Sequence, residues 1–437
     1  MGGAVPRQRE SSRDRVIMHV DMDAFFVGVE LLTRPELVGR QVVVAGSGPR
    51  SVVLSASYEA RALGVGSAMP TTKARQLAPH AVYIDPSHGQ YRKYSQKIME
   101  ILGSVTDQLE QVSVDEAFLD VTGAIRRLGP PVGIARDIRR RITEETGLVA
   151  SIGISSNKFL AKMASTGSKP DGLWLVPGSM AEQFLAPLPV RKLWGVGEKT
   201  ARILHDAGFD TVGAVQEAPY SLLQRRLGKA AGAHLYELCR GIDERPVVTE
   251  RVEKSMGAEH TFSYDTDDVR EIKSALLQLS HDVARRIRAA ERRAYGVAIK
   301  VRDENFHTVS RARALEQGAT TGREVYEAAA RLFDDLGPLP CRIRLVGVRA
   351  ERFDAHDAGR QLSLWDQASE DTFVHEAEWG QAESTMDLIW AKFGPSGLRP
   401  ATLLEGTISP RYERKQEKVD GSRTSDGQES EEGPSRQ

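Results

Sequence analysis

Cysteine is scarce in this chain, and long apolar runs are missing from it. Only two of its 437 residues are cysteines, Cys239 and Cys341. Two cysteines so far apart predict neither a disulfide framework nor a Cys-x-x-Cys metal site, and they are typical of a reducing compartment. No apolar run approaches 18 residues, and the polar, basic residues 1–15 contain no signal-peptide core. We therefore expect a cytoplasmic protein that has no membrane partner.

The formal net charge of −1 conceals an uneven distribution of charge along the chain. Residues 1–350 carry 49 Lys or Arg and 42 Asp or Glu, whereas residues 351–437 carry 10 and 18. A basic body is compatible with a polyanionic partner, although a modest excess of this kind is also typical of ordinary solvated surface. Charge alone does not decide between these interpretations.

The length of the chain exceeds what one hydrophobic core usually supports, so we expect three or more units. Alternating strand and helix patterns predict an α/β sheet domain first, and short helical pieces with many glycines follow it. A segment with proline and mixed charge then reads as a linker before a second compact unit of strands and helices. The acidic end, with no aromatic residue after Tyr412, is too polar to form a core, although residues 382–393 have a helical pattern. The expected segments are 1–15 (disordered), 16–176 (α/β), 177–241 (helical), 242–253 (linker), 254–350 (second unit) and 351–437 (mostly disordered).

Carboxylates accompany apolar strand patterns at two places far apart in the sequence. The stretch 16–26 reads as a strand that delivers Asp21, and the stretch 113–120 reads as a strand that carries Asp115 and Glu116. Brought together, these three acids could hold a pair of Mg²⁺ ions and leave coordination positions for phosphates and water. For any one acid, the capping of a helix or turn is the simpler interpretation.

Two further patterns are compatible with contacts to a nucleic-acid backbone. Gly195 and Gly197 open a helical stretch, and free N–H groups at such a place suit a phosphate oxygen. An ordinary turn between two helices explains these glycines equally well. In the second unit, cationic residues alternate along strand patterns and predict either an exposed face or a phosphate track, which we favour. These residues are Lys300, Arg302, Arg311, Arg313, Arg342 and Arg344.

Four motifs in the right order and spacing resemble those of the Y-family translesion DNA polymerases, and most resemble the bacterial DinB or DNA polymerase IV branch. The motifs are DMDAFFVGVE at residues 21–30, YEAR at 58–61, SVDEA at 113–117 and SKPDG at 168–172. The resemblance implies a multidomain α/β (α+β) polymerase shaped like a right hand. Its parts would be a palm (16–24 and 88–176), small fingers (25–87), a helix-hairpin-helix thumb (177–241) and a little finger (254–350).

The resemblance also implies the reaction and the roles of individual residues. The enzyme would extend primers past damaged bases by two-metal phosphoryl transfer from dNTPs, with low processivity and no proofreading, as a monomer. Asp21, Asp115 and Glu116 would be catalytic and, with the Met22 carbonyl, would hold two Mg²⁺ ions. Simple strand alternation would make Asp23 a ligand as well, but the family pattern leaves it as support.

The incoming nucleotide would contact residues from three of these motifs. Phe25, Phe26, Tyr58, Arg61 and Lys169 match the family's dNTP-binding positions, and the last three would donate to the triphosphate. Phe26 matches the steric gate, whose ring leaves no room for a ribose 2′-hydroxyl; a purely structural phenylalanine is the alternative.

The resemblance places DNA along the thumb and little finger, and a protein partner on the tail. Gly195 and Gly197 would contact DNA, as would Lys300, Arg302, Arg311 and Arg313. The segment NKFLAK at 157–162 resembles the part of the palm near DNA, so its lysines are weaker candidates. The pentapeptide QLSLW resembles the motif by which bacterial polymerases bind the sliding clamp, with Trp in place of the commoner Phe. Its contact residues would be Gln361, Leu362, Leu364 and Trp365.

Two other functions compete with a polymerase. A non-catalytic accessory protein of the same fold would bind DNA and the clamp, but it would not need all three acids. A helix-hairpin-helix DNA-binding protein or nuclease would need neither the YEAR motif nor Phe26.

Overall fold

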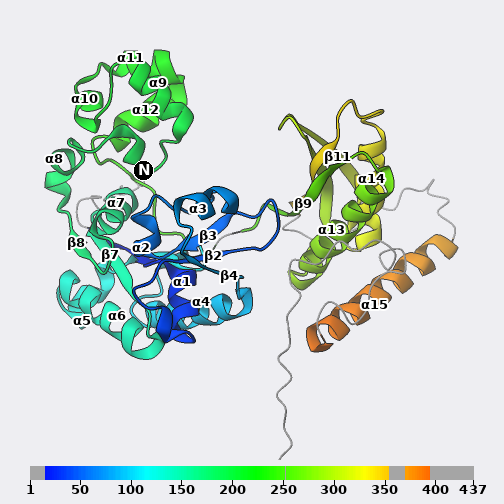
Figure 1. Cartoon of the computed structure of the whole chain (residues 1–437), viewed down its shortest axis with the longest axis horizontal. Helices are drawn as coiled ribbons and strands as arrows, with labels where there is room; N and C mark the ends of the chain where they lie inside the picture. The colour runs from blue at the N-terminus through cyan, green and yellow to red at the C-terminus, as the bar shows by residue number, and fades with distance from the viewer. Residues whose placement is uncertain (1–14, 251, 354–369, 394–437) are drawn as a thin grey trace, which may run out of the picture. The chain divides into compact units, whose positions relative to one another are not determined.

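The structure is a computed structural model that describes residues 15–250, 252–353 and 370–393 (Figure 1). The chain divides into two compact units, residues 1–252 and 253–437. This boundary lies at the end of the predicted linker. Among the described residues, no helix has the length and apolar character needed to cross a membrane.

The first unit contains a five-stranded sheet, a three-stranded sheet and most of the helices. Its strands are β1 (Ile17–Met22), β2 (Val42–Ala45), β3 (Val53–Ala56), β4 (Val82–Ile84), β5 (Leu109–Gln111), β6 (Glu116–Asp120), β7 (Ala150–Ser155) and β8 (Leu173–Leu175). Its helices are α1 (Phe25–Leu32), α2 (Tyr58–Arg61), α3 (Thr71–Leu77), α4 (His88–Gly103), α5 (Ile125–Leu128), α6 (Pro131–Thr146), α7 (Lys158–Ser168), α8 (Ala181–Leu185), α9 (Glu198–Asp206), α10 (Val212–Glu217), α11 (Tyr220–Leu227) and α12 (Lys229–Leu238).

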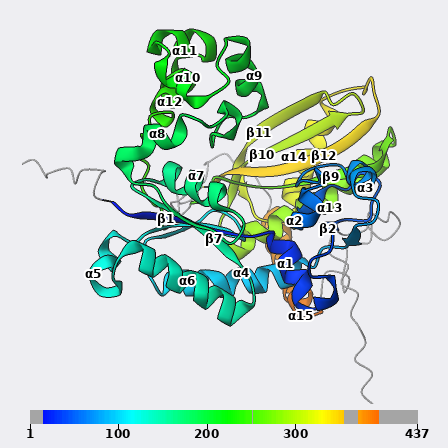
Figure 2. The ribbon, with the colours of Figure 1, turned by 60° about the vertical axis from the view of Figure 1, so that its left-hand side comes forward.

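Strand β1 is the centre of the large sheet, whose order is β5-β6-β1-β7-β8. It pairs antiparallel with both β6 and β7, and only β7 and β8 pair in parallel. The α/β (α+β) class is therefore confirmed, although the central strands do not form the parallel sheet that a simple strand–helix alternation suggests. Figure 2 shows α7 on one side of this sheet and α4 and α6 on the other.

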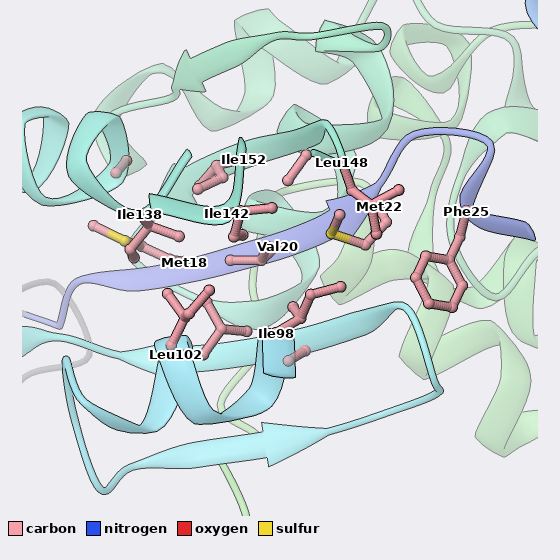
Figure 3. Close-up of a cluster of buried hydrophobic side chains, with 14 of the residues drawn as sticks. Met18, Val20, Met22, Phe25, Ile98, Leu102, Ile138, Ile142, Leu148 and Ile152 are labelled. Atoms are coloured by element: carbon pink, nitrogen blue, oxygen red, sulfur yellow. The ribbon is translucent and has the colours of Figure 1, made fainter. Parts of the chain in front are cut away.

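The alternation of side chains along β1 separates the core from the acidic face. Met18, Val20 and Met22 point toward α4 and α6 and are fully buried there (Figure 3). His19 and Asp21 point to the other face, where α7 packs, because successive strand residues alternate. Gly153 lets α7 approach closely, since a Cβ atom there would lie 2.0 Å from the backbone oxygen of Ala161.

Two smaller bodies complete the first unit. Residues 42–84 form the sheet β3-β2-β4, with a core of its own. Helices α8 to α12 bury a separate apolar cluster that also includes residues from α7. The predicted helical character of residues 177–241 is thus confirmed.

The predicted linker is partly bound to the first unit. Glu110 on β5 accepts hydrogen bonds from the Lys158 ammonium at 2.7 and 2.6 Å and from the backbone N–H of Val248 at 2.8 Å. Asp243 forms two hydrogen bonds, of 2.7 and 2.9 Å, with the Arg245 guanidinium. The pair of the buried Lys158 with Glu110 and the hydrogen bond from the Phe159 N–H to Asp243, neither of which sequence composition reveals, therefore help to hold the segment from Asp243 to Val248 in place.

The second unit is a four-stranded antiparallel sheet of order β11-β10-β12-β9, with helices on one face. Apolar residues of α13, α14 and the sheet form its core. The elements are β9 (Ser255–Thr266), α13 (Val269–Ala289), β10 (Ala294–Asp303), β11 (Thr308–Ala319), α14 (Gly322–Asp334), β12 (Ile343–Phe353) and α15 (Glu370–Phe393).

Helix α15 contains residues 382–393, whose helical pattern was visible in the sequence, and it packs against the rest of the second unit. Glu383 is 3% exposed, accepts a hydrogen bond of 2.8 Å from the backbone N–H of Gly322, and pairs with Arg288 at 2.6 Å. Asp387 also binds Arg288, at 2.8 and 3.0 Å. A carboxylate at the N-terminus of α14 is stabilised by the helix dipole, so Glu383 joins the two helices. The predicted disordered ends beyond α15 and before Arg15 lie outside the described residues.

Candidate active site

The pairing of β1 with β6 brings the predicted acids together. Asp21 lies directly opposite Glu116, and the backbone N–H of Met22 donates to the carbonyl of Asp115 at 3.0 Å. The acids stand at the start of β6, not at its end, because the two strands are antiparallel and β1 ends where β6 begins. Strand register thus places Asp21 and Glu116, 95 positions apart, side by side.

Glu116 is held by two donors from the α7 face. Its Oε1 accepts a hydrogen bond from His19 Nε2 at 2.7 Å and also contacts the Lys162 ammonium. Burial opposes the ionised carboxylate, but the hydrogen bond from His19 and the contact with Lys162 outweigh it and lower the pKa of Glu116 to about 2. Burial lowers the pKa of His19. Because the ionised Glu116 can only accept, Nε2 of His19 donates to it, while Nδ1 lies 2.6 Å from the Ser165 hydroxyl oxygen.

Asp115 has the opposite electrostatic environment. Its carboxylate accepts a hydrogen bond from the Ser113 hydroxyl at 2.5 Å. Burial raises the pKa of Asp115, and the negative charges of Asp21 and Glu116 raise it further. The site therefore concentrates negative charge that a bound cation would neutralise.

Asp21 and the carbonyl of Met22 converge on one cationic atom. The Lys169 ammonium lies 2.6 Å from Asp21 Oδ1 and 2.9 Å from the Met22 oxygen. Two oxygens directed at a single positive charge form the kind of partial oxygen site that a divalent cation uses. In the part of the chain that the structure describes, no three His, Cys, Asp or Glu side chains already surround one point as ligands.

Tyr58 and Arg61, the first and last residues of the YEAR motif, are oriented by their neighbours. The Tyr58 hydroxyl donates to Asp23 at 3.2 Å, and burial followed by the Asp23 charge raises the pKa of Tyr58, so the phenol stays protonated. The Arg61 guanidinium donates to the Ala56 carbonyl at 2.9 Å and lies 4.8 Å from the centre of the Tyr58 ring. Both side chains are half-buried.

Phe25 and Phe26 begin α1 but have different surroundings. Phe25 is 3% exposed and belongs to the core, which leaves only its backbone for a contact with nucleotide. Phe26 is half-buried and stacks on the ring of Tyr91 at 4.1 Å and 11°. The Tyr91 hydroxyl donates to the buried Glu30 carboxylate at 2.6 Å, so the surface behind Phe26 is rigidly held.

Four of the predicted DNA-contacting residues lie just before α9 or on β10. Gly195 has a φ of +100°, and Gly197 precedes α9 with no side chain capping the helix, so the N–H groups of its first turn are free of such a cap. Lys300 pairs with Glu259 at 2.8 Å, and Arg302 donates to the Thr308 hydroxyl at 2.8 Å.

The register of the second sheet corrects the expectation that its cations share one face. Arg311 lies opposite Ile299, a core residue on the helix-covered face, whereas Lys300 lies opposite Ser310 on the other face. Arg313 lies on the same face as Arg311, because strand positions two apart share a face. Each strand alternates as expected, but the pairing between strands cannot be read from one strand alone.

Several residues contribute to the site without having been predicted from the sequence. His19 is two residues before Asp21, and strand periodicity could have placed it on the acidic face. Lys162 was a candidate for DNA contact, yet it binds Glu116, and Lys158 is bound to Glu110. No sequence signal identified Tyr91 or Ser151. The predicted clamp motif at 361–365 lies outside the described residues.

Three family models match the chain. They are described as impB/mucB/samB family over residues 20–166, impB/mucB/samB family C-terminal domain over residues 253–364, and DNA polymerase-iota, thumb domain over residues 191–243. Together they match parts of both structural units, and the first spans the acids and the YEAR motif.

Similar proteins and structures agree with these matches. DNA polymerase IV of Desulfatibacillum aliphaticivorans is 39% identical over 391 residues, which are 90% of this chain and 97% of that protein. DNA polymerase IV of Staphylococcus aureus (strain JH9) is 38% identical over 354 residues, 81% of this chain and 99% of that protein. The solved Y-family DNA polymerase chimera Dbh-Dpo4(243-245)-Dbh is 28% identical, has a TM-score of 0.69, and is matched over 77% of this chain and 98% of its own.

Proposed function

The chain belongs to the impB/mucB/samB family of Y-family DNA polymerases, and from that membership we propose how its residues act. It is a template-directed DNA polymerase of the translesion class. We propose that residues 16–24 and 88–176 form the palm, 25–87 the fingers, 177–241 the thumb and 254–350 the little finger. The observation that carries the mechanism is the register pair of Asp21 and Glu116 with Asp115 beside it.

The family depends on divalent metal ions, and we propose that two Mg²⁺ ions bind at Asp21, Asp115, Glu116 and the Met22 carbonyl. The convergence of the Asp21 and Met22 oxygens on the Lys169 ammonium supports this site, as does the raised pKa of Asp115. When bound, the ions would activate the primer 3′-hydroxyl and neutralise charge on the departing pyrophosphate. The protein's own part is to hold these oxygens in place, and His19 and Lys162 do this for Glu116.

We propose that the dNTP lies beside these acids, against Phe26. Tyr58, Arg61 and Lys169 would donate to the triphosphate, which combines a phenol, a planar guanidinium and a point charge. The flat packing of Phe26 on Tyr91 supports a role in sugar selection, because a ring with a rigid support cannot move aside for a 2′-hydroxyl.

We propose that primer-template DNA contacts Gly195 and Gly197 in the thumb and Lys300 and Arg302 in the little finger. The capless start of α9 and the face shared by Lys300 and Arg302 support this. Arg311 and Arg313 remain candidates on the opposite face. We also propose that the segment 361–365 binds a bacterial sliding clamp and that the polymerase acts in the cytoplasm as a monomer.

Primer extension with Mg²⁺ tests the proposed chemistry. Asp21→Asn should lower the rate by about 10³-fold or more, because it removes a ligand charge. Asp120→Asn is the matched control, since Asp120 stands at the far end of the same strand pair, opposite Ile17. Equal extension by the Asp21→Asn variant and the parent would overturn the assignment.

A further inference from the structure

Asp23 is the acid of the first motif whose role strand alternation and the family pattern describe differently. It lies one residue beyond β1, and its side chain is 5% exposed. Its backbone N–H donates to the Val149 carbonyl at 2.9 Å, which fixes the residue against the chain that enters β7. The position of its carboxylate is therefore set by the sheet.

Three donors from three separate segments use the oxygens of Asp23. The Tyr58 hydroxyl donates to Oδ1 at 3.2 Å, and the backbone N–H of Asp171 donates to Oδ2 at 2.6 Å. The Ser151 hydroxyl lies 3.1 Å from both oxygens. A buried carboxylate whose lone pairs already accept these bonds has little capacity left to bind a metal ion.

The donors belong to the elements that carry the proposed triphosphate contacts. Tyr58 is the first residue of α2, and Asp171 is two residues after Lys169. The same turn is tied again to β7, because the N–H of Gly172 donates to Ser151 Oγ at 3.1 Å. A side chain at Gly172 would collide with the carbonyl oxygen of Ser168 at 1.8 Å, so the turn has little freedom.

We propose that Asp23 is a positioning residue for the incoming nucleotide, and that its carboxylate fixes the Tyr58 hydroxyl and the turn bearing Lys169 relative to one another. This inference rests on the proposed function, in which both side chains contact the triphosphate. Tyr58 and Lys169 are far apart in sequence and lie on different elements. Without a shared acceptor, each would have to be ordered by the nucleotide itself, which weakens binding.

Equilibrium binding of dNTP to the enzyme on a dideoxy-terminated primer-template tests the inference. Asp23→Asn replaces one acceptor oxygen by an NH₂ group that meets donors, and it should raise the dNTP Kd by about 10-fold. In steady-state extension the KM should rise similarly, while kcat changes by less than about 3-fold. Asp120→Asn should leave both unchanged.

A second variant and a double mutant separate positioning from a general loss of structure. Ser151→Ala keeps Asp23 and removes one donor, so it should raise the Kd in the same direction by a smaller factor. In a Tyr58→Phe background, Asp23→Asn should raise the Kd by less than it does in the parent, because one of its partners is already gone. An equal factor in both backgrounds would overturn the link through Tyr58.

The controls distinguish failure of the inference from failure of the proposed function. If Tyr58→Phe and Lys169→Met leave the dNTP Kd unchanged, the proposed triphosphate contacts are wrong. If these two variants weaken binding but Asp23→Asn and Ser151→Ala do not, only the role of Asp23 is wrong. A fall in kcat with an unchanged Kd for Asp23→Asn would also contradict it, since that result indicates a part in the chemistry.

Discussion

The imidazole of His19 donates a hydrogen bond of 2.7 Å to Glu116, across the register of two antiparallel strands. With Lys162 on α7, it keeps this carboxylate ionised and fixed in direction. The neighbouring Asp115 has no cationic side chain bound to it in the described contacts and has a raised pKa. Two adjacent acids thus have opposite electrostatic environments.

The contrast between these acids predicts opposite effects on the stability of the metal-free protein. The pKa of Glu116 is lowered from 4.5 to about 2, so its contribution is present above pH 4.5 and is lost as pH falls toward 2. Glu116→Gln should therefore destabilise the protein at pH 7 by on the order of 3 kcal/mol. Asp115→Asn should not destabilise it, because the raised pKa of Asp115 means that ionisation opposes folding as pH rises.

Urea unfolding at pH 7, followed by circular dichroism in the presence of EDTA, measures both effects. Both variants should lose polymerase activity. Equal destabilisation by the two substitutions would show that the described partners of Glu116 do not distinguish it from Asp115.

Phe26→Ala should lower the discrimination against ribonucleotides by about 10-fold or more, while deoxynucleotide incorporation is partly retained. Because Phe26 is half-buried, the loss of stability should be modest, about 1–2 kcal/mol. Phe25→Ala is the matched control: its ring is in the core, so it should cost about 3–5 kcal/mol without a comparable change in sugar selection. Competition between dNTP and NTP in single-nucleotide extension gives the answer, and unchanged discrimination in the Phe26→Ala variant would contradict a gate.

Glu383→Ala should detach α15 from the rest of the second unit. The change leaves Arg288, which is 14% exposed, and the N–H of Gly322 without this partner, at a cost of about 3 kcal/mol. Hydrogen exchange should accelerate at α15 and at the first turn of α14. Glu327→Ala, which breaks an exposed pair with Arg323, should change exchange there very little. Unaltered protection in the Glu383→Ala variant would rule out the proposed anchor.

Glu110→Ala should release the segment that follows the thumb. It leaves the Lys158 ammonium, 7% exposed, without its carboxylate, and frees the N–H of Val248. A glutamate-specific protease should then cut after Glu244 faster than in the parent. Asp107→Ala, at an exposed acid three residues earlier, should leave the cleavage rate unchanged. Similar rates in all three proteins would mean that the ion pair does not hold this segment.

Local patterns predicted the elements that position the site, because apolar periodicity and the acids were both visible. The strand patterns at 16–26 and 113–120 contain β1 and β6, which carry Asp21 and Glu116. The long-range partners were not visible. Nothing near Glu116 in the sequence indicates that Lys162, 46 residues later, binds it, since that contact depends on how closely α7 packs on Gly153.

The same limit explains the corrected predictions. The two faces of the second sheet were confused because Arg311 alternates correctly within its own strand, while its face is set by pairing with Ile299. The helical pattern of residues 382–393 was visible in the sequence, but the buried pair of Glu383 with Arg288 was not. Composition describes what a segment could bury alone, not what other parts of its unit supply to it.

A crystal structure of the enzyme with primer-template, an incoming dNTP and a divalent cation would show where the metal ions and the nucleotide bind. We expect cation density at Asp21, Asp115 and the Met22 carbonyl, with the Lys169 ammonium and the Tyr58 hydroxyl on the triphosphate. We also expect the ring of Phe26 to lie against the sugar. A nucleotide bound elsewhere, or cations that leave Asp21 and Asp115 uncoordinated, would contradict the proposed site.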